Sequence, residues 1–213
     1  MRDILLIALA WFAYGLVHSW LAGRGVKAWV MRHWPRLAPA YRLAYNAIAT
    51  LLLIPPLALT LSMPGEVEWD VPSWIAWPAA IAAVAGFVWS LRWYDMGEFL
   101  GLAQWRRHDG REQEGFVLSP LHRYVRHPWY GLGLLLLWTR DLNAAWLTTA
   151  VVLSIYLLIG SRLEERKLVE RYGEAYRRYQ ARVPGLIPWP GRCLSPAEAE
   201  ALRQAAGKTT TGA

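Results

Sequence analysis

Hydrophobic positions in this chain come in long blocks and do not alternate with polar positions. Three blocks, residues 3–22, 41–62 and 72–91, each have about the 20 mostly apolar residues that a membrane-spanning helix needs. Only helices and closed barrels satisfy every backbone hydrogen bond inside lipid, and these blocks lack the two-residue period of barrel strands. The pattern therefore predicts a helical integral membrane protein.

The C-terminal half begins with a shorter apolar block, Trp129–Trp138, which as a helix would cross roughly half of a bilayer. A polar turn at residues 140–143 separates it from the longer apolar block 144–160. These two blocks predict a helical hairpin. An amphipathic helix is expected from Ser161 until prolines interrupt it near Val183-Pro184.

The fold class that follows is all-α, an integral membrane bundle of about five transmembrane helices whose last two form the hairpin. Residues 195–213 start with a plausible helix cap at Ser195, and we expect a short cytoplasmic helix and then a disordered Lys-Thr-Thr-Thr tail. Residues 1–194 would form a single membrane domain, with 195–213 as its C-terminal appendage.

The net charge of +7 is distributed in a way that indicates topology. Basic residues gather between the first two blocks and again after the third, while the loop between the second and third blocks carries only acidic charges. These residues are Arg24, Lys27, Arg32, Arg36 and Arg42, then Arg92, Arg106, Arg107, Arg111, Arg123 and Arg126, and the acidic Glu66, Glu68 and Asp70.

Because cytoplasmic loops of membrane proteins are enriched in Lys and Arg, the N-terminus is expected outside and the C-terminus in the cytoplasm. The basic excess then reflects topology and attraction to membrane lipid headgroups, and we expect no nucleic-acid partner.

Two polar motifs flank the predicted hairpin. The first is Arg126-His127-Pro128-Trp129-Tyr130-Gly131, and the second is Glu164-Glu165. A hairpin returns its ends to the same side, so an arginine, a histidine and two carboxylates are expected to converge at one membrane boundary. That combination suits a charged ligand beside lipid. The five scattered histidines and the single cysteine have no metal-ligand spacing, so no metal site is expected.

These motifs resemble the isoprenylcysteine carboxyl methyltransferase and phospholipid methyltransferase superfamily. The similarity covers about residues 115–190 and rests on Leu121-His122-Arg123-Tyr124-Val125-Arg126-His127-Pro128-Trp129-Tyr130, Arg162-Leu163-Glu164-Glu165, and Tyr172-Gly173-Glu174-Ala175-Tyr176-Arg177-Arg178-Tyr179. The N-terminal half, with Val17-His18-Ser19 and Tyr41-Arg42-Leu43-Ala44-Tyr45-Asn46, more closely resembles two bacterial branches, the NnrU-like proteins and the methanethiol S-methyltransferases.

The resemblance implies an enzyme, a methyltransferase that uses S-adenosylmethionine at the cytoplasmic membrane edge. It implies cofactor-binding roles for His122, Tyr124, Arg126, His127, Tyr130, Glu164 and Glu165. The superfamily more commonly has Tyr where this chain has His122. Chemically, Arg126 or His127 suits the cofactor's carboxylate, and Glu164 or Glu165 its ammonium group.

Each of these residues also has a structural interpretation. The alternative for Arg126 is a contact with lipid phosphate, and the alternative for His127 is a cap on the helix that follows. Adjacent glutamates on a helix point about 100° apart, so we expect one to bind cofactor and the other to pair with Arg162 or Arg166. The tyrosines at 172, 176 and 179 are expected to pack more than to contact ligand.

We also predict catalytic roles, on the acceptor side, for His18 and Asn46, with Arg126 as the third catalytic position. The topology puts His18 and Asn46 at similar depth, and ionisable groups within a membrane usually face a cavity. An interhelical hydrogen bond is the structural alternative. A small or amphiphilic methyl acceptor is expected, with a thiol favoured. The alternatives are an isoprenylcysteine carboxylate, a lipid amine, or a non-catalytic NnrU-like protein linked to nitrogen-oxide metabolism.

Overall fold

The computed structural model describes residues 2–110 and 115–211, so Arg111 and the last two residues of the predicted tail lie outside it. Four helices are long and apolar enough to cross a membrane, namely Arg2–Leu21, Pro35–Ser62, Ser73–Trp93 and Ala144–Arg182, and Pro128–Trp138 is a shorter apolar helix. Most of the side chains in the four long segments are not buried inside the protein, as expected for helices that face lipid. The all-α membrane class predicted from the sequence is confirmed.

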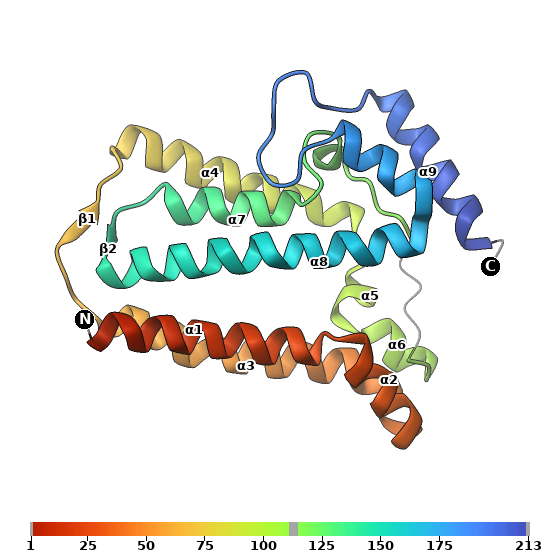
Figure 1. The fold of residues 1–213 in the computed structure, drawn as a ribbon, viewed down its shortest axis with the longest axis horizontal. Helices are drawn as coiled ribbons and strands as arrows, with labels where there is room; N and C mark the ends of the chain where they lie inside the picture. Colours follow the sequence, from red (N-terminus) through yellow and green to blue (C-terminus); the bar gives the residue numbers. More distant parts are fainter. Residues whose placement is uncertain (1, 111–114, 212–213) are drawn as a thin grey trace. The chain divides into compact units, whose positions relative to one another are not determined.

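The chain divides into two compact units (Figure 1). The first contains α1 (Arg2–Leu21), α2 (Arg24–His33), η1 (Pro35–Ala40), α3 (Tyr41–Ser62), β1 (Val67–Trp69), α5 (Met96–Leu100), α6 (Leu102–Arg107), β2 (Leu142–Asn143) and residues 144–153 of α8. The second contains α4 (Ser73–Ser90), η2 (Leu91–Trp93), η3 (Pro120–Arg123), α7 (Pro128–Trp138), the rest of α8 (Ala144–Arg182) and α9 (Pro196–Thr211).

In the first unit α1 and α3 pack side by side around a core that includes Ile7 and Trp11 (Figure 1). The indole Nε1 of Trp11 donates to Thr60 Oγ1 at 3.1 Å, and Thr60 Oγ1 lies 3.0 Å from Thr149 Oγ1. Since lipid offers no hydrogen-bond partners, buried polar side chains of membrane helices pair with one another. This chain of bonds fixes the two helices and the start of α8 in register.

A short antiparallel pair, β1 with β2, joins two loops of the first unit. Asn143 Nδ2 also donates to the carbonyl of Met63 at 3.1 Å. The sequence predicted a turn at residues 140–143 and a loop between the second and third apolar blocks, and it did not predict the strand in either place. Strands of two and three residues are too short to leave an alternating pattern in the sequence.

The polar segment after the third apolar block is anchored to α3. Asn46 Nδ2 donates to the carbonyls of Phe99 at 3.0 Å and Leu100 at 3.1 Å, and Arg42 Nε donates to Phe99 O at 3.1 Å. Gly101 has φ +92°, and a Cβ there would lie 2.5 Å from the backbone nitrogen of Leu43. Both the backbone conformation and the close approach therefore require glycine at 101.

In the second unit α4 packs against α7, and α7 and α8 form the predicted hairpin. Trp138 Nε1 donates to Ser154 Oγ at 2.9 Å near the turn, and Tyr130 Oη donates to Glu164 at 3.1 Å near the open end. Helix α8 continues to Arg182 but breaks at Gly173, whose φ 56° and ψ −129° are not helical.

The C-terminal helix is longer than predicted. It runs from Pro196 to Thr211 and so includes the Lys-Thr-Thr-Thr segment that was expected to form a tail. A capping box starts it, with Ser195 N donating to Glu198 Oε2 at 2.6 Å and Glu198 N to Ser195 Oγ at 3.2 Å. Ala199 and Ala206 bury its apolar side in the core of the second unit, which supports the helix beyond the cap.

Candidate functional site

The start of α7 is held against the segment that follows α8. The backbone N–H of Arg126 donates to Pro184 O at 2.9 Å, and that of His127 donates to Gly185 O at 3.0 Å. A Cβ at Gly131 would come within 2.6 Å of Leu186 O, so this close contact needs a glycine. The Arg126-His127 pair is therefore presented on a backbone fixed on both sides.

Glu165 lies at the centre of a charged cluster. Its Oε1 accepts from Arg126 Nε at 2.7 Å and lies 3.0 Å from His127 Nε2. Its Oε2 accepts from Arg126 Nη2 at 3.1 Å and from Gln180 Nε2 at 2.9 Å. The side chains of Arg126, His127 and Glu165 are 14%, 5% and 12% exposed, so the ion pairs are shielded from water.

The other donors of Arg126 also point at protein groups. Nη1 donates to the carbonyl of Gln180 at 3.0 Å and to that of Val183. Among the described residues the guanidinium thus binds one carboxylate and two carbonyls. This geometry disfavours the alternative that Arg126 serves lipid phosphate, and it gives Arg126 the task of tying α7 to both halves of α8.

Glu164 is the exposed member of the pair, with 47% of its side chain accessible. Its Oε2 accepts from Tyr130 Oη at 3.1 Å and lies 3.5 Å from His127 Nδ1. The rings of His127 and Tyr130 stack with centroids 5.3 Å apart. We expected one glutamate to pair with Arg162 or Arg166, whereas Glu165 pairs with Arg126 and Glu164 bonds to Tyr130.

His127 occupies the N-cap position of α7, but its side chain makes no capping hydrogen bond. Its ring instead lies between the two carboxylates, with Nε2 toward Glu165 and Nδ1 toward Glu164. The alternative that the His127 side chain caps α7 is therefore wrong. A ring in this position can fix both carboxylates at once.

His122 is a buried histidine apart from this cluster. Its Nδ1 accepts from the Ser119 N–H at 3.1 Å, and its carbonyl accepts from Tyr179 Oη at 2.6 Å. Burial, with a smaller contribution from the charge of His127, lowers the pKa of His122 to about 4. A neutral ring that caps η3 is primarily a structural element.

Tyr124 is 47% exposed and lies beside the guanidinium of Arg123, 5.6 Å from its ring centroid. Among the described residues no hydrogen bond links Tyr124 or His122 to the two glutamates. Of the seven predicted cofactor positions, the structure brings together five: Arg126, His127, Tyr130, Glu164 and Glu165.

The three tyrosines of the C-terminal motif are packing residues. Tyr172, Tyr176 and Tyr179 are each 2% exposed and surround Phe116, with ring centroids 4.9–6.1 Å from it. They form the core that holds the end of α8 in place. The expectation that they pack more than they contact ligand agrees with this burial.

A polar cavity of about 630 Å³ opens beside Glu165 on one face of α8. Its walls come from residues on both sides of the break at Gly173 and carry both signs of charge: Arg162, Glu165, Arg166, Val169, Glu170, Arg177 and Gln180. Arg177 and Gln180 were not among the predicted site residues. Helical spacing puts Arg162, Arg166 and Val169 on one face of α8. Arg177 and Gln180 line the same cavity only because the helix breaks at Gly173.

His18 and Asn46 have different partners in the first unit. His18 Nε2 lies 2.8 Å from Tyr45 Oη, and its ring also packs 5.6 Å from that of Tyr14. Asn46 instead bonds the carbonyls of α5 described above. An interhelical hydrogen bond is thus present for His18, and its partner Tyr45 was not predicted.

Comparison with known proteins finds curated relatives. The chain is 31% identical to a methanethiol S-methyltransferase of Pseudomonas sp. (strain GM41(2012)), over 87% of this chain and 72% of that protein. It is also 31% identical to the methanethiol S-methyltransferase of Mycobacterium tuberculosis, over 84% of this chain and 75% of that protein. The chain is also 31% identical to the methanethiol S-methyltransferase of Pseudomonas deceptionensis, over 87% of this chain and 71% of that protein. No family model matches the chain, and no solved structure matches it.

Proposed function

The chain belongs to the methanethiol S-methyltransferase family, and we propose that it moves a methyl group from S-adenosylmethionine to the sulfur of a small thiol. It is an integral membrane methyltransferase. Methanethiol is the acceptor that the names of the relatives support. An isoprenylcysteine carboxylate, a lipid amine and a non-catalytic NnrU-like role are not favoured, because the relatives described above are named for a thiol.

Charge supports the cofactor assignment. The amino-acid end of S-adenosylmethionine carries a carboxylate and an ammonium group, so a fitting site must offer both cations and anions. The cavity beside Glu165 does so, with Arg162, Arg166 and Arg177 as cations and Glu170 as an anion. Its volume of about 630 Å³ is also within the usual range for ligand sites.

The roles we assign follow from which groups already have partners. Both oxygens of Glu165 accept bonds from Arg126, His127 or Gln180, so Glu165 and Arg126 act mainly as positioning residues for the cavity wall. The cavity arginines would take the cofactor's carboxylate. Exposed Glu164, with Tyr130, would take a positive group of the ligand. His122 and Tyr124 stay as predicted cofactor positions.

When bound, the cofactor supplies a methyl group that its sulfonium already activates. The protein therefore needs to position two reactants and exclude water more than to provide strong acid or base chemistry. The single observation that carries the proposal is the convergence of Arg126 and His127 on Glu165 at the wall of a cavity of mixed charge.

On the acceptor side we keep His18 as the proposed group that receives the thiol proton as the thiolate attacks. Its hydrogen bond to Tyr45 supports this role, because such a bond fixes the orientation of the ring. Asn46 donates hydrogen bonds to two backbone carbonyls of α5, and its proposed contribution is to hold α5 against α3.

The orientation with the N-terminus outside and the C-terminus in the cytoplasm is part of the proposal. The charge pattern assigns the loops that contain β1 and β2 to the same side of the membrane, and the pairing of these two strands agrees with that common side without identifying it. The cofactor residues at the open end of the hairpin would then face the cytoplasm.

Turnover by purified protein tests the function. The detergent-solubilised enzyme with methyl-labelled S-adenosylmethionine and methanethiol should release labelled dimethyl sulfide, measured in the headspace by gas chromatography. Prenylcysteine and phosphatidylethanolamine serve as rival acceptors. Glu164→Gln should reduce the rate of methyl transfer. Glu200→Gln, at an exposed position of α9, is the matched control and should leave this rate unchanged. Labelled prenylcysteine or lipid without dimethyl sulfide would contradict a thiol acceptor.

A further inference from the structure

The loop that joins α8 to α9 in the second unit exposes two large apolar side chains (Figure 1). We call residues 183–191 the apolar loop, and none of its residues carries a charge. Ile187 and Trp189 are 73% and 67% exposed, although neither belongs to a helix that could face lipid. Apolar side chains that gather on the surface in this way mark an interaction site.

Hydrogen bonds constrain both ends of the apolar loop. At its far end the backbone N–H of Arg192 donates to Trp189 O at 3.1 Å, and Arg192 Nη2 donates to Ala181 O at 2.7 Å. Its near end accepts the backbone bonds from the start of α7 that are described above. Pro188 and Pro190 restrict the backbone between these ends, because the proline ring fixes φ. The exposed side chains are therefore presented by a constrained loop.

The level of the apolar loop relative to the membrane follows from the end of α4. Residues 73–93 can cross a membrane, and Ser90 is the last residue of α4 within this segment. Trp129 Nε1 donates to Ser90 Oγ at 2.7 Å, so the start of α7 lies at this end of the span. The backbone bonds of Arg126 and His127 place the near end of the loop beside it. The apolar loop therefore lies at the boundary between lipid and water.

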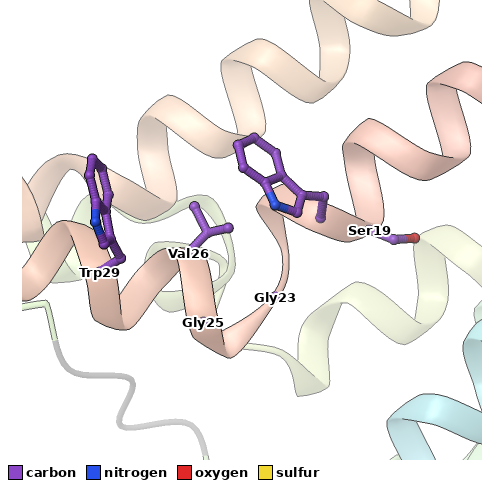
Figure 2. A pocket seen from close by; sticks show the side chains of 6 residues that line it. Ser19, Gly23, Gly25, Val26 and Trp29 are labelled. Carbon is purple, nitrogen blue, oxygen red and sulfur yellow. The ribbon is translucent and has the colours of Figure 1, made fainter.

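Exposed tryptophans mark the end of a span elsewhere in this chain. In the first unit Trp20, near the end of α1, is 63% exposed, and Trp29 on α2 is 43% exposed and lines the same open groove (Figure 2). Tryptophan prefers the level of the lipid headgroups, because its ring is apolar and its N–H needs a polar partner. Trp189 has the same chemistry, but a loop brings it to that level and not a span.

We infer that the apolar loop inserts into the membrane interface, where Ile187 and Trp189 contact the outer part of the lipid acyl chains. The insertion is shallow, because backbone groups of a loop find no hydrogen-bond partner in the hydrocarbon core. Pro184, Pro188 and Pro190 reduce this cost, since proline has no N–H to leave unbonded. The loop thereby anchors the end of α8 to the membrane beside the start of α7. This interaction surface does not depend on the methyl-transfer reaction.

Spin labelling of the protein in phosphatidylcholine vesicles tests the depth of the loop. In a Cys193→Ser background, a nitroxide at Ile187→Cys or Trp189→Cys should collide more often with oxygen, which dissolves in lipid, than with a water-soluble nickel chelate. Leu158→Cys, in the apolar part of α8, is the lipid control, and Glu174→Cys, at a side chain that is 64% exposed, is the water control. Loop labels that behave like the water control would overturn the proposal. So would immobilised labels that neither reagent reaches, because they would indicate a protein partner.

A second pair of variants tests the native side chains of the loop. With the nitroxide at Pro188→Cys, Ile187→Ser/Trp189→Ser should lower the rate of collision with oxygen several-fold and raise that with the chelate, because serine has little apolar surface to bury. Glu174→Ser/Glu200→Ser changes two exposed side chains of the same unit and should leave both collision rates unchanged. All four substituted side chains are exposed, so the melting temperature should stay close to that of the parent protein. Unchanged collision rates in Ile187→Ser/Trp189→Ser would overturn the proposal.

Discussion

Arg126 spans both carboxylate oxygens of Glu165, with Nε 2.7 Å from Oε1 and Nη2 3.1 Å from Oε2. The same guanidinium reaches the carbonyls of Gln180 and Val183. The planar guanidinium has five N–H donors and can bond a carboxylate and two carbonyls at once, whereas the ammonium group of a lysine does not reproduce this geometry. Through this residue the start of α7, the middle of α8 and the end of α8 are held together.

The two adjacent glutamates should respond differently to substitution. Glu165→Gln leaves the largely buried charge of Arg126 without its counter-charge, which should lower the free energy of unfolding by about 3 kcal/mol. Glu164→Gln changes an exposed side chain, so the melting temperature should stay the same while affinity for S-adenosylhomocysteine falls about tenfold. Thermal melting and calorimetric titration measure the two effects. A stable Glu165→Gln variant with normal affinity would contradict these roles.

Asn46 should behave as a structural residue. Asn46→Ala removes the donor that serves the carbonyls of Phe99 and Leu100, which should cost about 1–3 kcal/mol and expose α5 to protease. Limited proteolysis and thermal melting report this loss. Thr50→Ala, one turn further along α3, is the control, because its hydroxyl bonds only within its own helix. Normal melting with strongly reduced turnover would instead restore the acceptor role predicted for Asn46.

Acid should destabilise the protein through His122. Its pKa is about 4 in the folded protein, because the ring is buried, and about 6.5 when unfolded. The unfolded chain therefore binds one more proton between these values, so stability falls as pH drops from 6.5 toward 4, by about 1.4 kcal/mol per unit. His122→Gln should melt at a lower temperature at pH 7.5 but lose less stability on acidification. Parallel melting curves for both proteins across this range would be inconsistent with a neutral, buried His122.

The sequence was sufficient to predict features that depend on hydrophobic length and on spacing along a hairpin. Because α7 and α8 run antiparallel, Tyr130 and Glu164 had to approach each other, and the structure joins them by a hydrogen bond. The resemblance to methanethiol S-methyltransferases is likewise confirmed by the relatives. Neither inference required knowledge of how any helix is rotated about its axis.

Features that depend on rotation and on backbone breaks could not be predicted. His18 was expected to act with Asn46. Instead, Tyr45, the residue just before Asn46, lies on the face of α3 that contacts His18. Gln180 reaches Glu165 only because α8 breaks at Gly173, and nothing in the amphipathic pattern indicated a break there. A one-residue step changes direction by 100° on a helix, so apolar periodicity alone does not assign partners.

Accessibility from the two sides of the membrane tests the topology. In a background with Cys193→Ser, a cysteine at exposed Glu68 should react with an impermeant maleimide added outside intact cells. A cysteine at Arg106 should react only after the membrane is permeabilised. Labelling in the opposite order would reverse the orientation and put the hairpin's charged cluster outside.

The pair formed by His18 and Tyr45 allows the acceptor-side proposal to be separated from a purely structural one. The two side chains are joined at 2.8 Å between α1 and α3. If His18 receives the thiol proton, His18→Ala should lower the rate of methyl transfer at least tenfold while affinity for S-adenosylhomocysteine stays within twofold, since proton transfer by a positioned side chain contributes about 10²–10⁴-fold. Tyr45→Phe keeps the ring but removes the hydrogen bond, so it should reduce the rate less than His18→Ala does.

A structural hydrogen bond predicts another result for the same two variants. Both would then lower the melting temperature, because each breaks the same bond between helices, and His18→Ala would lower it more because it also removes the ring that packs against Tyr14. Turnover of the remaining folded enzyme would stay normal. Measuring rate, cofactor affinity and melting temperature on both variants decides between the two roles, and a loss of cofactor affinity in His18→Ala would reject both of them.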